Sequence, residues 1–276
     1  GQERFIFVDR ACIDQEEFEK KLRERFAAPW ISNSPRIIFS LTITYLPYWQ
    51  IENNAKDIDD ILCFSIDEAL KKGSGSTLHI DEVIVSRMKR DIAVESAIEK
   101  TIEKNSIQVY YQPIYSTATG LLDEAEALAR LFDDEIGFIP PDEFIAKAEQ
   151  NGTIITLGRQ IFEKVCQFIR DNDISQYGVK KIGVNLSAVQ CMQTELSEEL
   201  IEMAEKYRVS LSGIYLETTE TATIGNRKTM KDNMDIMIKH GASYALDDYG
   251  TGYSNLVNIL QFPFDVVKID KSLVWT

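Results

Sequence analysis

A repeated alternation of strand and helix patterns constrains the fold of this chain most. Short apolar runs typical of buried strands occur at residues 107–112, 124–131, 182–186, 214–217, 244–247 and 266–269. Amphipathic helical segments separate them, at 141–150, 154–170, 197–207 and 227–240. Repeated β-α units predict a parallel sheet, and this many units predict an α/β barrel or a doubly wound sheet.

The residues before this repeat predict a smaller α/β unit. Strand patterns occur at 5–8, 37–45 and 77–80, and helical patterns occur at 15–26 and 55–72. A polar, helix-favouring segment at 85–105 lacks sustained heptads, so it predicts a connecting helix rather than a coiled coil. We therefore expect three parts, with boundaries at 1–84, 85–105 and 106–276.

The composition narrows the possible partners. A formal net charge of −14 over 276 residues argues against nucleic acid or an anionic membrane as a general partner. No apolar run reaches membrane-spanning length and no signal peptide is visible, so we expect a cytoplasmic protein. The chain starts at Gly1 without a methionine, so an upstream segment could carry a sensor domain or a membrane anchor. The four cysteines form no C-x-x-C pair, which disfavours a zinc site.

Two adjacent carboxylates, Asp247 and Asp248, follow the apolar run at 244–246. In a β/α barrel, the C-terminal ends of the strands hold the chemistry. Neighbouring side chains on an extended strand point to opposite faces, so the two aspartates can share one metal site only if the strand ends there. We expect Gly250 and Gly252 to provide that break and to leave the following loop able to move.

Further polar side chains accompany the neighbouring strand patterns. They are Glu126 and Arg130 in 124–131, Asn185 in 182–186, Glu217 and Glu220 around the end of 214–217, and Lys268 in 266–269. Carboxylate and amide oxygens suit Mg²⁺ or Mn²⁺. Shared acids suit two such ions roughly 3.5–4 Å apart, which clamp the oxygens of a displacement at phosphorus. Arg130 can hold a phosphate in a bidentate fork, and Lys268 can position the attacking water.

Seven ordered segments resemble the EAL domain of cyclic-di-GMP phosphodiesterases. They are YYQPI at 110–114, EALAR at 126–130, IPP at 139–141, NLS at 185–187, ETTE at 217–220, DDYGTGYS at 247–254 and KID at 268–270. The resemblance runs from about residue 91 to the last residue. It implies a (β/α)8 TIM-like barrel, hydrolysis of cyclic di-GMP to linear pGpG with two Mg²⁺ or Mn²⁺ ions, and a homodimer formed through this domain.

The resemblance also assigns roles to single residues. The metal ligands would be Glu126, Asn185, Glu217, Asp247 and Asp248. Lys268 would assist the nucleophilic water and complete a catalytic set with Glu126, Asp247 and Asp248. The dinucleotide would contact Gln112, Leu128, Arg130 and Asn185. Glu220 would steady the loop 249–256, although a helix cap is the structural alternative, and Gln112 could instead be a strand-edge residue.

The first residues resemble a degenerate GGDEF signature. Glu3 alone keeps the pattern, since Gln2 replaces the second glycine and Arg4 reverses the charge of the acid that normally holds the fourth position. We therefore expect residues 1–84 to be the C-terminal part of a GGDEF domain without cyclase activity. Its expected role is in packing and dimerisation, and the alternative is a regulatory role through GTP binding.

The barrel pattern stops after about six strands, whereas a complete barrel has eight. We therefore expect a fragment of a longer protein, cut at both ends, which alone would be inactive and fold poorly. For the parent protein, the alternative to an enzyme is a catalytically inactive receptor that binds cyclic di-GMP. Another metal-dependent barrel enzyme would fit the carboxylates but not the loop 249–256.

Overall fold

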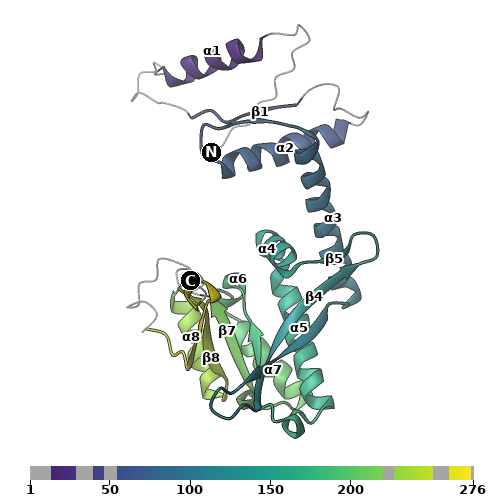
Figure 1. Ribbon diagram of the computed structural model, residues 1–276, viewed down its shortest axis with the longest axis vertical. Coiled ribbons are helices and arrows are strands. Elements are labelled where there is room, and N and C mark those ends of the chain that lie inside the picture. The colour runs from purple at the N-terminus through teal and green to yellow at the C-terminus, as the bar shows by residue number, and fades with distance from the viewer. Residues whose placement is uncertain (1–13, 29–39, 47–54, 220–226, 251–260, 275–276) are drawn as a thin grey trace. The chain divides into compact units, whose positions relative to one another are not determined.

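The computed structural model describes residues 14–28, 40–46, 55–219, 227–250 and 261–274 (Figure 1). The chain divides into two compact units, Gly1–Asp91 and Ile92–Thr276. The boundaries expected from the sequence, 1–84, 85–105 and 106–276, stay a prediction. Among the helices that the structure describes, none is both long enough and apolar enough to cross a membrane.

The larger unit contains every strand and helix that the sequence predicts between residues 107 and 269. After α3 (Glu82–Lys104), which begins in the smaller unit, its elements are β3 (Gln108–Tyr115), β4 (Leu122–Asp133), β5 (Gly137–Ile139), α4 (Pro141–Asn151), α5 (Ile154–Asp171), η2 (Ile174–Tyr177), β6 (Lys181–Asn185), α6 (Ala188–Cys191), α7 (Leu196–Tyr207), η3 (Leu211–Gly213), β7 (Ile214–Thr219), α8 (Arg227–Lys239), β8 (Ser243–Tyr249), β9 (Val266–Ile269) and α10 (Lys271–Val274). The strand β5 and the short helices were not predicted.

These strands form one sheet in the order β3-β4-β6-β7-β8-β9, with β5 paired to β4. From β4 to β9 the neighbours run parallel, as the β-α repeat predicts. The first strand is an exception, because β3 runs antiparallel to β4 and places Gln112 opposite Glu126. The expectation of a parallel sheet is wrong for this pair. Residues 116–121 join the two strands, and a parallel crossover needs about a dozen residues or more.

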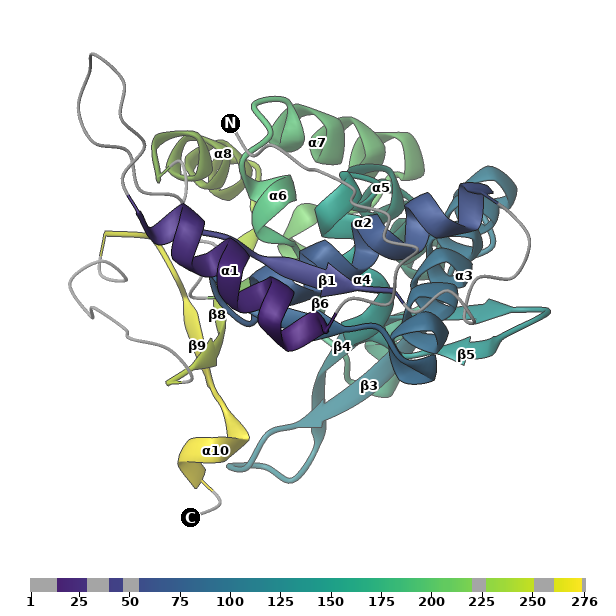
Figure 2. The same ribbon diagram turned by 90° about the horizontal axis from the view of Figure 1, so that it is seen from above.

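The core of this unit lies between the sheet and its helices. In Figure 2, helices α5, α7 and α8 lie together on one side of the sheet. Apolar side chains from that side form one continuous buried cluster, which includes Phe162 of α5, Leu200 of α7, Met234 of α8 and Leu216 of β7. Because side chains alternate along a strand, the opposite face of β6, β7 and β8 is left for a second set of residues. That second face holds the polar side chains described below.

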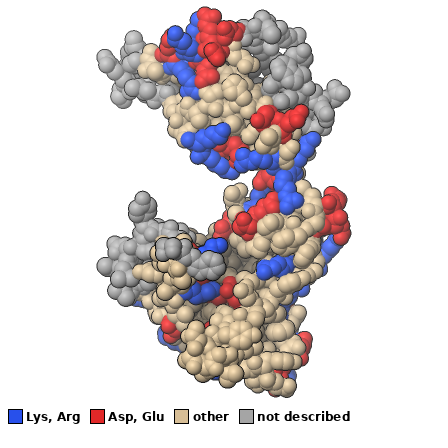
Figure 3. Space-filling view, in the orientation of Figure 1, with Lys and Arg blue, Asp and Glu red and all other residues tan. Residues whose placement is uncertain are grey.

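The smaller unit has its own core. Helix α1 (Gln15–Ala27), strand β1 (Ile43–Tyr45), helix α2 (Ala55–Lys71) and strand β2 (Thr77–His79) precede α3, and β1 pairs in parallel with β2. Acidic and basic side chains lie side by side on α1 (Figure 3). Arg23 of α1 donates hydrogen bonds to the carbonyl oxygens of Leu41 at 3.1 Å and Gly75 at 2.8 Å, and so ties the helix to the strand ends.

Of the strands predicted for this unit, one is shorter in the structure and one lies outside the described residues. The strand pattern at 37–45 is shorter in the structure, where β1 begins at Ile43 and residues 40–42 are not in a strand. The pattern at 5–8 and the signature at 1–5 lie outside the described residues.

Candidate functional site

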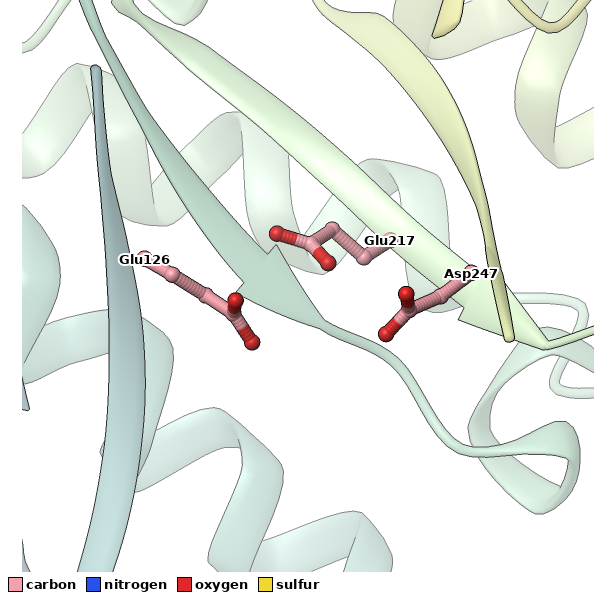
Figure 4. Close-up of side chains that lie close together, drawn as sticks. All are labelled: Glu126, Glu217 and Asp247. Carbon is pink, nitrogen blue, oxygen red and sulfur yellow. The ribbon is translucent and has the colours of Figure 1, made fainter. Parts of the chain in front are cut away.

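Three carboxylates from three strands converge on the face of the sheet opposite the helices. They belong to Glu126 of β4, Glu217 of β7 and Asp247 of β8, and each offers an oxygen within 4.8 Å of the others (Figure 4). The parallel register explains the convergence, since it turns residues 126, 183, 215 and 243 to one face and carries Glu217 and Asp247 further along that face. The sequence prediction of a carboxylate cluster built across separate strands is thus met for these three residues.

The ammonium group of Lys268 lies among these carboxylates. Its Nζ donates to Glu126 Oε2 at 3.1 Å and to Glu217 Oε2, and it lies 3.4 Å from Asp247 Oδ1. Burial alone would lower the pKa of Lys268, but the hydrogen bond to Glu217 and the surrounding negative charges raise it. The lysine is therefore held as a cation at the centre of the cluster.

Glu217 is the most buried member, with none of its side chain exposed. Its pKa is raised to about 7, chiefly by burial and in part by the nearby Glu126 carboxylate, against the opposing effect of the hydrogen bond from Lys268. Glu217 Oε1 is buried and has no hydrogen-bond partner among the residues that the structure describes. Leaving such an oxygen unpartnered costs free energy. A set of three carboxylates with oxygens this close together fits a hard divalent cation such as Mg²⁺ or Mn²⁺.

Asn185 adjoins the cluster at the end of β6. Its side-chain amide donates to Glu126 Oε1 at 2.9 Å. The chain then turns into α6, which Ser187 and Gln190 begin with reciprocal capping hydrogen bonds. The amide is therefore placed beside Glu126 by the strand end and the capped helix that follows.

The two adjacent aspartates do not mark the end of their strand, as the sequence had suggested. Strand β8 continues to Tyr249, and its pairing with β9 shifts register between Leu246 and Tyr249. Within this irregularity Asp248 adopts a left-handed backbone, with φ of 55°. A bulge breaks the strict alternation of side chains between the two faces, so both aspartate side chains can point toward the same site although the strand does not end there. Partial burial, followed by the charge of Asp247, raises the pKa of Asp248.

The predicted dinucleotide contacts lie on neighbouring positions of the same surface. Gln112 of β3 is exposed and stands directly opposite Glu126. Leu128 and Arg130 share the face of Glu126 by alternation along β4. The Arg130 guanidinium donates to the carbonyl oxygen of Ala129 at 2.9 Å and stacks over the Tyr110 ring, with 5.6 Å from Cζ to the ring centroid.

Some predicted site residues lie outside the described part of the chain. They are Glu220 and residues 251–256 of the loop. Gly250, at the start of that loop, has φ of 102°, a conformation that favours glycine.

Two residues beside the cluster were not singled out from the sequence. A methyl group at Gly183 of β6 would overlap Glu217 Oε1 and would come within 2.5 Å of Cζ and 2.6 Å of the hydroxyl oxygen of Tyr215. Gly183 therefore provides the space into which the Tyr215 ring and the Glu217 carboxylate both fit. The available signal was a glycine inside a strand, which often marks a close approach of another group.

Comparisons with known proteins identify the family to which the chain is similar. A model of the EAL domain family matches residues 95–276. The chain is 26% identical over 219 residues to the cyclic di-GMP phosphodiesterase NbdA of Pseudomonas aeruginosa, a match that covers 75% of this chain and 28% of that protein. It is 29% identical over 211 residues to the cyclic di-GMP phosphodiesterase PdeL of Escherichia coli, covering 76% of this chain and 58% of that protein.

A solved structure is similar as well. The PaMucR phosphodiesterase in its c-di-GMP complex has a TM-score of 0.61 and 25% sequence identity, covering 66% of this chain and 74% of that chain. The chain spans less than two thirds of the length of either curated relative, NbdA or PdeL.

Proposed function

The chain belongs to the EAL domain family, and on that premise we propose that its parent protein hydrolyses cyclic di-GMP to linear pGpG in a metal-dependent reaction. One observation carries the proposal: Glu126, Glu217 and Asp247 bring carboxylate oxygens within 4.8 Å of one another, with Lys268 among them. The phosphodiesterase names of two relatives support the choice of substrate.

The oxygen donors of the chain would hold Mg²⁺ or Mn²⁺ in a two-ion site. The ligands would be Glu126, Asn185, Glu217, Asp247 and Asp248. When bound, such ions polarise a phosphoryl oxygen and lower the pKa of bound water. Lys268 would donate a hydrogen bond to the attacking water and so orient it toward phosphorus, since its ammonium has three donors and already lies among the carboxylates.

The exposed side chains of the β3–β4 hairpin would bind the dinucleotide. Gln112 stands opposite Glu126, and Leu128 offers an apolar surface beside it. Arg130 would exchange its contact with the Ala129 carbonyl for a phosphate oxygen, a stronger, charge-assisted hydrogen bond. Glu220 would steady the loop 249–256.

The remaining proposals for the parent protein rest on the sequence resemblance. Residues 1–84 would be the C-terminal part of a degenerate GGDEF domain without cyclase activity. Homodimers would form through the EAL domain.

The test is to incubate the parent protein with cyclic di-GMP and Mg²⁺ or Mn²⁺, and to follow pGpG by liquid chromatography. We expect product that disappears with EDTA and with Glu126→Ala, because that variant removes an oxygen donor. Glu149→Ala is the matched control, since Glu149 is also half-buried but lies on helix α4. Tight binding of cyclic di-GMP without turnover in Mg²⁺ and Mn²⁺ would instead identify a receptor and refute the enzymatic proposal.

A further inference from the structure

Tyr215 faces the same region of the sheet as the carboxylate cluster. It is paired in register with Gly183 of β6 and Ser243 of β8, so its side chain shares their face, and Glu217 follows two positions later on that face. The residue is only 5% exposed. Its side chain thus lies on the polar face of the sheet rather than in the apolar cluster against the helices.

The Tyr215 hydroxyl and Glu217 Oε1 lie close together at the unsubstituted Cα of Gly183. A methyl group there would collide with both of these groups. Glu217 Oε1 is buried and accepts no hydrogen bond from the described residues. Its other oxygen, Oε2, accepts from Lys268. Glu217 Oε2 is therefore bonded to Lys268, and Oε1 lies near the Tyr215 phenol.

We propose that Tyr215 is a positioning residue, whose hydroxyl donates to Glu217 Oε1 and thereby fixes Oε2 toward the bound cation. The inference rests on the proposed function, because it takes the Glu217 carboxylate to be a metal ligand. Ligating carboxylates commonly need such a partner, and loss of the partner typically weakens metal affinity about 10- to 100-fold.

Carboxylates share the face of the phenol. Glu124 and Glu126 of β4 lie on the face that also carries Tyr215 and Glu217, as the register of β4, β6 and β7 shows. A phenol hydroxyl has one proton to donate, so here that proton can point to a carboxylate oxygen.

Gly183 completes the arrangement. A glycine inside a strand weakens the strand, since it offers no side chain for packing. Here the missing side chain lets the Tyr215 ring extend over β6 toward Glu126, which pairs with Gly183 from the other side. Any larger residue at position 183 would separate the phenol from the carboxylate that it supports.

The test compares Tyr215→Phe with Tyr244→Phe in the purified parent protein. Both variants remove one buried hydroxyl, but Tyr244 belongs to the apolar cluster on the helix side of the sheet. Isothermal titration of Mn²⁺ into nucleotide-free protein should give a dissociation constant about 10- to 100-fold weaker for Tyr215→Phe. Tyr244→Phe should bind Mn²⁺ as the wild type does. Turnover by Tyr215→Phe should need correspondingly more Mn²⁺, with KM for cyclic di-GMP unchanged at saturating metal.

The possible outcomes separate this inference from the function on which it rests. Wild-type hydrolysis together with an unchanged Mn²⁺ affinity in Tyr215→Phe overturns the inference alone. An equal loss in Tyr244→Phe also overturns it, because the effect would then follow from general loosening of the fold. If the wild type binds Mn²⁺ but never hydrolyses the dinucleotide, a weaker affinity in Tyr215→Phe still supports the positioning role while the proposed reaction fails. A wild type that binds no Mn²⁺ overturns both.

Discussion

Replacing Lys268 by methionine tests whether this one side chain offsets the negative charge of the whole carboxylate cluster. The ammonium group contacts Glu217, which is fully buried, and lies 3.1 Å from Glu126 Oε2 and 3.4 Å from Asp247 Oδ1. Methionine keeps most of the apolar length of the lysine side chain and removes the charge. In metal-free protein, the variant therefore removes the ammonium group that contacts all three carboxylates.

The magnitude follows from these distances. At an effective dielectric constant of about 20, unit charges 3.1 Å apart interact by about 5 kcal/mol. Desolvation of the lysine offsets part of this, and removing one partner of a buried pair typically costs about 3–5 kcal/mol. Because Lys268 keeps 26% exposure, we take the lower end, about 3 kcal/mol. For a unit of the size of Ile92–Thr276, that loss lowers Tm by about 6–12 °C.

Thermal unfolding in EDTA, followed by circular dichroism, measures this shift. The matched control is Lys206→Met, which also breaks a lysine–glutamate contact, from Nζ to Glu163 Oε1 at 2.9 Å. Lys206 is 64% exposed, so its loss should lower Tm far less than the loss of Lys268 does. Saturating Mn²⁺ should narrow the gap between wild type and Lys268→Met, since a bound cation also neutralises the carboxylates. Equal melting of the two variants in EDTA would refute the reasoning.

Three further predictions concern packing, pH and thiol reactivity. Gly183→Ala should destabilise the protein by about 1–3 kcal/mol in urea unfolding, whereas Gly213→Ala, whose added methyl would meet only a carbonyl oxygen at 4.0 Å, should cost far less. Hydrogen bonds from Tyr207 and Lys206 lower the pKa of Glu163 from its ordinary 4.5. Its contribution to stability is therefore present above pH 4.5 and is lost as the pH falls through the pKa of Glu163 in the folded protein. The cost of Glu163→Gln should therefore shrink in acid, and equal costs at neutral and acid pH would contradict this. Cys166 is buried, with its pKa raised to about 12, so iodoacetamide should alkylate Cys63 before Cys166 in native protein, as peptide mass spectrometry can show.

Local periodicity was enough to predict where most elements of the larger unit lie. Helix α5 spans Ile154–Asp171, against a prediction of 154–170, because its apolar side chains recur at helical spacing and pack in the core. Strand β9 has the predicted bounds, Val266–Ile269. The direction of β3 was predicted wrongly, because an apolar strand pattern is the same in either direction, and only the short connection at 116–121 distinguishes a hairpin from a crossover.

The candidate site shows the same division between local and non-local information. Residue type and strand position identified Glu126, Glu217 and Asp247 as partners, since parallel strands bring their C-terminal parts to one edge. The irregularity at Asp248 was missed, because a bulge depends on pairing with β9, which lies about twenty residues further along the chain. The role of Gly183 was also missed, since it depends on a ring contributed by another strand.

The antiparallel pairing of β3 with β4 has a consequence for the order in which the molecule can assemble. Gln112 and Glu126 meet across a hairpin, so bringing them together closes only a short stretch of chain and costs little conformational entropy. Glu217 and Asp247 reach Glu126 only after long crossovers have been closed, and such non-local pairing is slow. The surface proposed for the dinucleotide can therefore take shape early from one contiguous segment. The proposed metal cluster has to wait for the sheet to assemble strand by strand.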